Sequence, residues 1–130
     1  MKSEESKRAL QDVLEFVEKA AGEIREIEAD AQRALFSQND PEDYRRQLEI
    51  KSMILLDLPE AVESLLADIE PRVGKEIMDG LIDFAKRAGY ALHLSSSFYM
   101  SLLLYPENYK EGEKNDLENF VERLRTLSND

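Results

Sequence analysis

The chain of 130 residues has no cysteine and no tryptophan, a single histidine, and only five glycines and four prolines. Without cysteine it can form no disulfide, thiolate metal site or thiol nucleophile. It also lacks any run of about 18 apolar residues, the length that a membrane-spanning helix needs. The polar start MKSEESKR does not resemble a secretory signal. We therefore expect a cytoplasmic protein that does not bind membranes.

Basic residues are in the minority. The chain has 17 Lys and Arg against 28 Asp and Glu, for a formal net charge of -11. Phosphate contacts require clustered Lys and Arg, so we expect no direct binding to nucleic acid. The segment 71–105 is the exception, with four basic and three acidic residues. A helix with so few charges is expected to be largely surrounded by protein.

Apolar residues recur at spacings of three and four along most of the chain, which predicts an all-α fold. At this length we expect one helical-bundle domain over 1–130. Proline marks the helix starts and ends, because it suits the first helical position but not the interior. The predicted helices cover 4–37, 41–56, 59–70, 72–105 and 115–128. A strand within 93–105 is the alternative for that segment.

Two of the predicted helices, 4–37 and 72–105, carry equally long apolar stripes. A helix over 4–37 would be about 50 Å long, which exceeds the diameter of a compact chain of this size. We therefore predict an elongated bundle of about five helices in which these two pack against each other in antiparallel order. In the helix 41–56 one charged residue, Lys51, falls on the apolar stripe.

The end of the predicted helix 72–105 is apolar on nearly every side. A single stripe cannot bury so many large side chains in a small bundle, and exposed apolar patches mark interaction sites. We therefore predict a homodimer or another protein partner. The expected interaction surface consists of Phe98, Tyr99, Met100, Leu103, Leu104 and Tyr105.

Two pairs of acidic residues follow the pattern ExxE and ExxD: Glu60 with Glu63, and Glu76 with Asp79. This arrangement resembles the metal signature of the MazG-type all-α NTP pyrophosphohydrolases. The resemblance implies that the four carboxylates hold Mg²⁺, which binds the triphosphate and activates water. Hard oxygen ligands suit Mg²⁺, and residues three apart share a helix face. A metal-dependent pyrophosphohydrolase is therefore the alternative function.

Two further interpretations involve His93. Arg87 and His93 resemble the Rx4-6H element of HEPN ribonuclease domains, but on a straight helix they point about 120° apart, so they meet only across a dimer or at a bend near Gly89. His93 also resembles the phosphoryl acceptor of His phosphotransfer domains, although HLSSS lacks the Lys-Gly pair that usually follows it there. We favour a protein that acts through protein contacts or self-association, without catalytic residues or cofactor.

Overall fold

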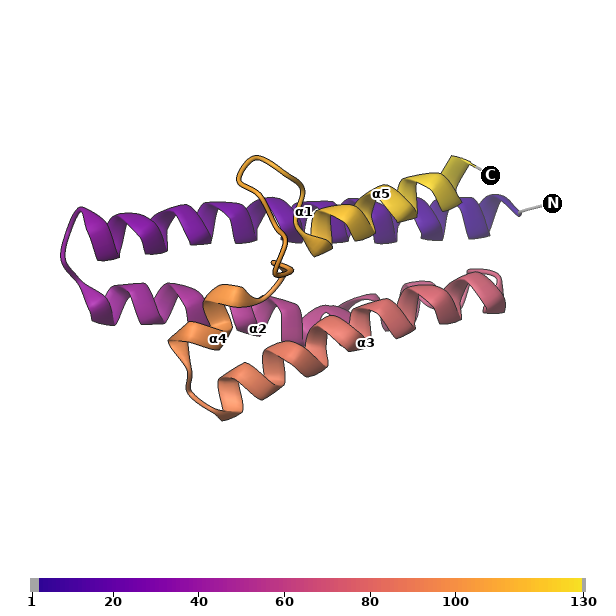
Figure 1. Cartoon of the computed structure of the whole chain (residues 1–130). Coiled ribbons are helices and arrows are strands. Elements are labelled where there is room, and N and C mark those ends of the chain that lie inside the picture. The colour runs from indigo at the N-terminus through magenta and orange to yellow at the C-terminus, as the bar shows by residue number, and fades with distance from the viewer. Residues whose placement is uncertain (1–2, 130) are drawn as a thin grey trace.

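The computed structural model describes residues 3–129, and within them the chain forms five α-helices and no β-strand (Figure 1). The helices are α1 (Glu4–Phe36), α2 (Pro41–Leu66), α3 (Pro71–His93), α4 (Ser97–Leu102) and α5 (Asp116–Asn129). The predicted all-α bundle of about five helices is confirmed, and the strand within 93–105 is wrong. No helix in this part of the chain is both long enough and apolar enough to cross a membrane.

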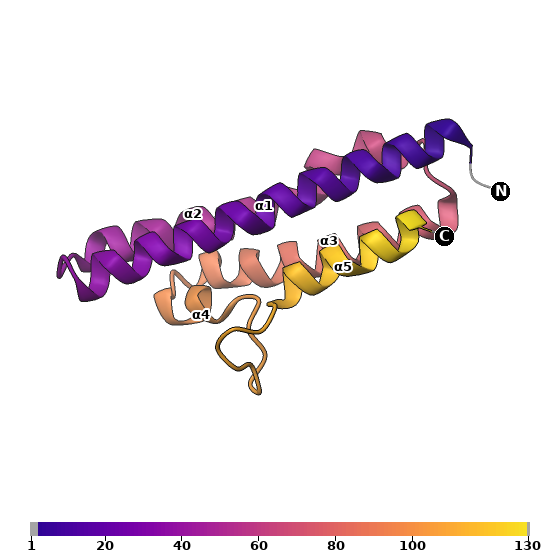
Figure 2. The ribbon, with the colours of Figure 1, turned by 90° about the horizontal axis from the view of Figure 1, so that it is seen from above.

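The four longer helices form an elongated up-and-down bundle (Figures 1 and 2). α1, α2 and α3 follow one another in antiparallel order, joined by connections of four residues, and such short connections favour antiparallel neighbours. α5 runs back along α1 but has only 14 residues. Beyond the start of α5, the small helix α4 packs on α2 and α3. Two short helices therefore share the fourth side of the bundle.

The predicted contact between the segments 4–37 and 72–105 is not observed. α1 packs along α2 and α5, and no Cα atom of α1 lies within 8 Å of one in α3. The short connection after α2 keeps α3 beside α2, and α3 therefore takes the position diagonal to α1. Side chains from the diagonal helices still share one core cluster, in which Val17 and Leu81 are fully buried.

The predicted helix boundary at Pro59 is also wrong, because α2 continues through it. A proline inside a helix removes a backbone hydrogen bond and costs about 3 kcal/mol. Leu55, Leu58 and Val62 lie on both sides of Pro59 and are buried in the main core. Their packing offsets the local cost, so the two predicted helices around Pro59 form a single one.

The predicted helix 72–105 is correct only in its first part, because α3 ends at His93 and three residues separate it from α4. Ser95 adopts a left-handed conformation with φ 52°. The Ser96 hydroxyl accepts a hydrogen bond from the Tyr99 backbone N at 3.1 Å and so caps α4. Serine side chains compete for backbone hydrogen bonds and favour helix caps over helix interiors. The break turns α4 back against α2.

Gly80 allows α3 and α5 to approach closely, and this predicts the effect of a substitution. A Cβ atom on Gly80 would lie 2.4 Å from Cε1 of Phe120, whose ring packs edge-on against Phe84. Gly80→Ala is therefore expected to lower the free energy of unfolding by about 1–3 kcal/mol, although alanine is the better helix former. In the control Gly22→Ala the new Cβ meets nothing within 4 Å, and we expect a gain of up to about 1 kcal/mol. Urea unfolding measures both; a gain for both variants would contradict the prediction.

Candidate functional site

The four carboxylates of the predicted metal site do not come together. Glu60 and Glu63 lie exposed on α2. Glu76 instead accepts two hydrogen bonds from Arg123, at 2.8 and 3.1 Å, and Asp79 pairs with a lysine one turn earlier on α3. In the described part of the chain, no three His, Cys, Asp or Glu side chains are placed so that they could hold a metal ion. The Mg²⁺ site implied by the pyrophosphohydrolase resemblance is therefore not assembled.

Arg87 and His93 lie on a single continuous helix. α3 runs through Gly89 without interruption. Arg87 forms an ion pair with Asp83 at 3.1 Å, and His93 is the exposed last residue of α3. At about 1.5 Å per residue the pair is separated by about 9 Å along the helix axis.

Five of the exposed large apolar side chains lie at the end of α3, on α4 and on the turn between them, and we call them the aromatic face: Tyr90, Leu94, Phe98, Tyr99 and Leu102. Tyr90 is 62% exposed and Phe98 is 66% exposed. Their rings flank the ring of Tyr99, at centroid distances of 6.5 and 5.7 Å. The aromatic side chains therefore form one connected group on the surface.

The aromatic face differs from the interaction surface predicted from the sequence. Of the six predicted residues only Phe98 and Tyr99 are exposed, because the turn before α4 directs the others inward. Met100 is 1% exposed and packs in a small core cluster, and Leu104 is buried in the main core. Leu103 and Tyr105 are half-buried. Sequence reasoning misses the rest of the face because it places the segment on one straight helix.

A groove of about 450 Å³ adjoins the aromatic face, between α3 and the segment that follows α4. Tyr90, Tyr99 and Leu102 of the face line it, and its charged lining residues are Lys86, Arg87 and Asp116. The segment 94–106 contains no Asp, Glu, Lys, Arg or His. The aromatic face and its groove therefore form a nearly neutral region on a strongly acidic chain.

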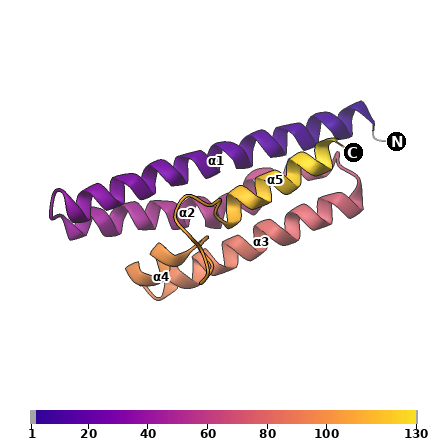
Figure 3. The ribbon, with the colours of Figure 1, turned by 45° about the horizontal axis from the view of Figure 1, so that its top comes forward.

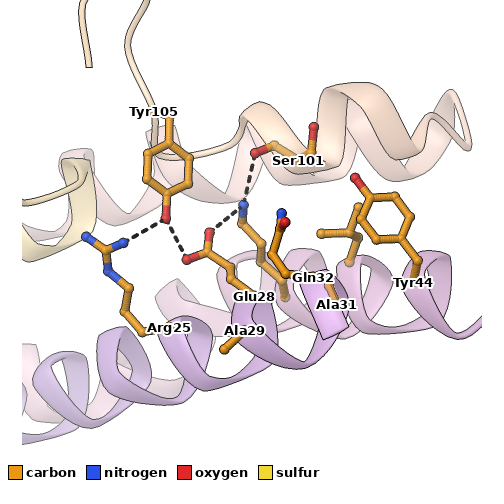
Figure 4. Close-up of a pocket in the computed structure, with 10 residues that line it drawn as sticks. Arg25, Glu28, Ala29, Ala31, Gln32, Tyr44, Ser101 and Tyr105 are labelled. Carbon is orange, nitrogen blue, oxygen red and sulfur yellow. Dashed lines mark hydrogen bonds and ion pairs between the residues drawn. The ribbon is translucent and has the colours of Figure 1, made fainter. Parts of the chain in front are cut away.

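The fourth side of the bundle is incomplete, because α5 covers only one half of α1, and α4 packs on α2 and α3 but not on α1 (Figure 3). A second hollow, which we call the notch, lies at this place (Figure 4). The notch has a volume of about 330 Å³. Its lining comes from α1, α2 and the segment 101–105: Arg25, Glu28, Ala29, Ala31, Gln32, Tyr44, Leu48, Lys51, Ser101 and Tyr105.

Lys51 lines the notch and is fully buried in spite of its charge. Its Nζ lies 3.0 Å from Oε2 of Glu28 and 3.5 Å from the backbone oxygen of Ser101. The Tyr105 hydroxyl donates a hydrogen bond of 2.5 Å to Oε1 of Glu28 (Figure 4). One carboxylate from α1 thus joins an ammonium from α2 to a tyrosine from the segment after α4.

The environment shifts the pKa values of both groups that Glu28 binds. Burial lowers the pKa of Lys51 below 10.5, and the carboxylate of Glu28 offsets this only in part. Burial also raises the pKa of Tyr105, and its hydrogen bond to Glu28 raises it further. Both shifts disfavour the charged form of the group, which is the protonated ammonium of Lys51 and the deprotonated phenolate of Tyr105.

Arg25 connects α1 to the start of α5. Its Nε and Nη2 donate to the two carboxylate oxygens of Glu118, at 3.0 and 2.7 Å. Its Nη groups also donate to the hydroxyls of Tyr105 and Tyr109, both at 3.3 Å. Glu118 accepts a hydrogen bond from the backbone N of Asn115, whose side chain accepts one from the Glu118 N, both at 2.9 Å. Asn115 and Glu118 therefore form a capping box at the start of α5.

The hydrogen bonds from Arg25 lower the pKa of Glu118 below its usual 4.5. In the unfolded chain this carboxyl has the higher pKa, so the unfolded state binds more protons as the pH falls below about 4.5. The stability that the pair contributes is therefore present above that pH. It is lost as the pH falls through the pKa of the folded state.

The sequence contains one signal of the notch, the charged Lys51 on an otherwise apolar stripe with Leu48 and Leu55. A buried lysine needs a counter-charge. Nothing in the sequence identifies that counter-charge, because Glu28 lies in a distant segment of the chain. The same holds for Tyr105, whose ring lies beside Lys51. Comparison of the chain with protein-family models, with curated proteins and with solved structures finds no match.

Proposed function

We propose that the protein acts by binding protein through its aromatic face, and that its partner is a second copy of the chain. The observation that carries this proposal is the exposure of five large apolar side chains on one surface region. Contiguous exposed apolar patches mark interaction sites, and most soluble oligomers are symmetric assemblies of one chain.

The distribution of charge supports contact between two copies at this place. Each copy has a net charge of -11, so contact through most other faces would bring like charges together. The segment 94–106 is free of charged residues, and Lys86 and Arg87 lie beside it. Two copies that meet here avoid the repulsion that disfavours contact elsewhere.

The shape of the aromatic face also suits a symmetric contact. Phe98 is largely exposed, and the groove of about 450 Å³ lies next to it on the same side of the molecule. A two-fold axis brings the same surface of both copies together, so a residue of one copy contacts the residues of the other copy that lie near its own equivalent. In the proposed dimer the Phe98 ring of each copy enters the groove of the other.

Phe98→Ser is expected to weaken the dimer about 1,000-fold, because an aromatic residue at the centre of an interface contributes about 2 kcal/mol and the two-fold contact contains two Phe98 rings, one from each copy. Sedimentation equilibrium over a range of concentrations measures the dissociation constant. The matched control is Phe36→Ser, at the end of α1 and outside the aromatic face, where the side chain is 75% exposed. We expect no change in dimerisation for that control.

Two results would overturn the proposal. One is a wild-type chain that sediments as a monomer at every concentration tested. The other is an equal effect of the Phe98 and Phe36 substitutions, which would mean that general surface hydrophobicity, and not the aromatic face, drives association. Thermal unfolding of both variants confirms that they remain folded.

A further inference from the structure

The notch contains hydrogen-bonding groups that the fold does not use. The side chains of Gln32 and Tyr44 line it, and neither forms a hydrogen bond with any described residue. Figure 4 shows the Gln32 amide and the Tyr44 hydroxyl directed from α1 and α2 toward the side on which Ser101 lies. Glu28 lies one turn before Gln32, lines the same hollow and is 17% exposed. A molecule in the notch would therefore meet two free polar groups and a carboxylate.

Stability alone does not account for the buried charges beside the notch. Replacement of a buried ion pair by apolar side chains of similar volume is often neutral or stabilising. The bundle has no shortage of apolar residues, since Ile50 and Met53 of α2 are exposed to solvent at 42% and 45%. Buried charges next to an open cavity are instead typical of binding sites.

The charges around the notch determine which class of ligand it suits. Arg25 and Lys51 contribute two positive charges, and Glu28 and Glu118 contribute two negative ones. This set is neutral, so a ligand with a net charge would remain uncompensated in a partly buried site, which is unfavourable. A ligand that carries one charge of each sign adds no net charge.

We propose that the notch binds a small zwitterion, namely a free α-amino acid with an apolar side chain. Each oxygen of Glu28 already accepts one hydrogen bond, from Lys51 or Tyr105, and retains a second lone pair for the ammonium group of the ligand. The amide of Gln32 and the hydroxyl of Tyr44 donate to its carboxylate. Ala31 and Leu48 line the notch where a short apolar side chain would pack. The volume of about 330 Å³ is at the small end of ligand pockets, as a ligand of this size requires.

Titration calorimetry with the full chain tests this class directly. The probes are L-valine, L-leucine, L-methionine and L-phenylalanine, together with N-acetyl-L-leucine, which lacks the ammonium group, and L-leucinamide, which lacks the carboxylate. We expect saturable binding of at least one of the four amino acids. Each leucine analogue is expected to bind at least about tenfold more weakly than leucine, because it loses hydrogen bonds to a charged group.

A pair of substitutions assigns the binding to the notch. Gln32→Ala combined with Tyr44→Phe removes both proposed donors, and we expect at least about tenfold weaker binding of the amino acid. The control Gln38→Ala changes an exposed residue between α1 and α2, outside the notch, and should leave the affinity unchanged. Thermal unfolding followed by circular dichroism shows whether each variant is folded.

Three results would overturn the inference: no saturable heat with any of the four amino acids, equal affinity for leucine and its two analogues, or unchanged binding in the variant that lacks both donors. The experiment does not depend on the aromatic face, since a monomer has a complete notch. Failure here would leave the proposed self-association untouched, and the reverse also holds.

Discussion

Glu28→Gln is expected to lower the free energy of unfolding by about 3 kcal/mol or more at neutral pH. The substitution preserves the shape of the side chain. Lys51 is fully buried, and among the described residues Glu28 is its only counter-charge within 4 Å. Removal of one member of a buried ion pair costs about 3–5 kcal/mol because the other charge remains unpaired. Urea unfolding of the wild-type and variant proteins measures the difference.

Lys51→Met shows how much of the stability depends on the ion pair and how much on the shape of the buried side chain. Methionine has a similar length and no charge, and Glu28 keeps its hydrogen bond from Tyr105. We therefore expect a smaller loss for Lys51→Met than for Glu28→Gln. In the double variant the loss caused by Glu28→Gln should largely disappear, because no buried cation remains. Additive losses in the double variant would contradict a direct interaction between the two residues.

The pH dependence of Glu28→Gln provides an independent check. Burial already lowers the pKa of Lys51 in the folded state below the 10.5 of the unfolded chain. Between the two pKa values the unfolded state binds more protons, so stability rises with pH in this range. Loss of Glu28 lowers the folded-state pKa further and widens the range. The defect of Glu28→Gln should therefore shrink from about pH 7 to about pH 10, and a defect that does not change with pH would contradict this explanation.

Arg25→Ala is expected to lower the free energy of unfolding by about 2 kcal/mol. The substitution removes the two-bond contact with Glu118 and the hydrogen bonds to Tyr105 and Tyr109. Hydrogen bonds to charged groups contribute about 1.5–3 kcal/mol, but Arg25 is 39% exposed and solvent screens part of the interaction. Hydrogen exchange should be faster in the segment 105–118, which Arg25 ties to α1.

The matched control for Arg25→Ala is Arg46→Ala. Arg46 pairs with Asp43 on the surface of α2 and is 65% exposed, so its removal should change stability by less than about 0.5 kcal/mol. The acid dependence adds a second criterion. Arg25 lowers the pKa of Glu118, so Arg25→Ala should reduce the loss of stability below about pH 4.5. Equal effects of the two arginine substitutions would contradict the role of Arg25 as the connection to α5.

The spacing of apolar residues was sufficient to predict the all-α class and the bounds of α1 and α5 to within one residue. Periodicity is a local property, and Val13, Val17 and Ile24, which follow it in α1, are fully buried as expected. The capping box of Asn115 and Glu118 is also local, since its two hydrogen bonds join residues three apart. Local signals of this kind depend only on the backbone geometry of one helix.

Local signals gave wrong predictions at two places, Pro59 and His93, where tertiary packing decides whether the helix continues. Pro59 ends a helix by its own chemistry, yet burial of Leu55 and Val62 on either side keeps α2 continuous. The apolar run after His93 favours a continued helix, yet Ser96 caps a new one. Because of this second difference the exposed surface is not the predicted one: Met100 is buried, and Tyr90 belongs to the aromatic face.

The sequence by itself therefore determined the all-α class, the acidic surface and the neutral character of the segment 94–106, since each depends on composition or on local periodicity. Only the tertiary structure decided which side chains meet. It kept the four carboxylates Glu60, Glu63, Glu76 and Asp79 from forming a metal site, and it placed Glu28 against Lys51. The physical reason is that the arrangement of the helices, such as the diagonal position of α3 relative to α1, depends on packing and on short connections. The spacing of residues within a single helix carries no information about it.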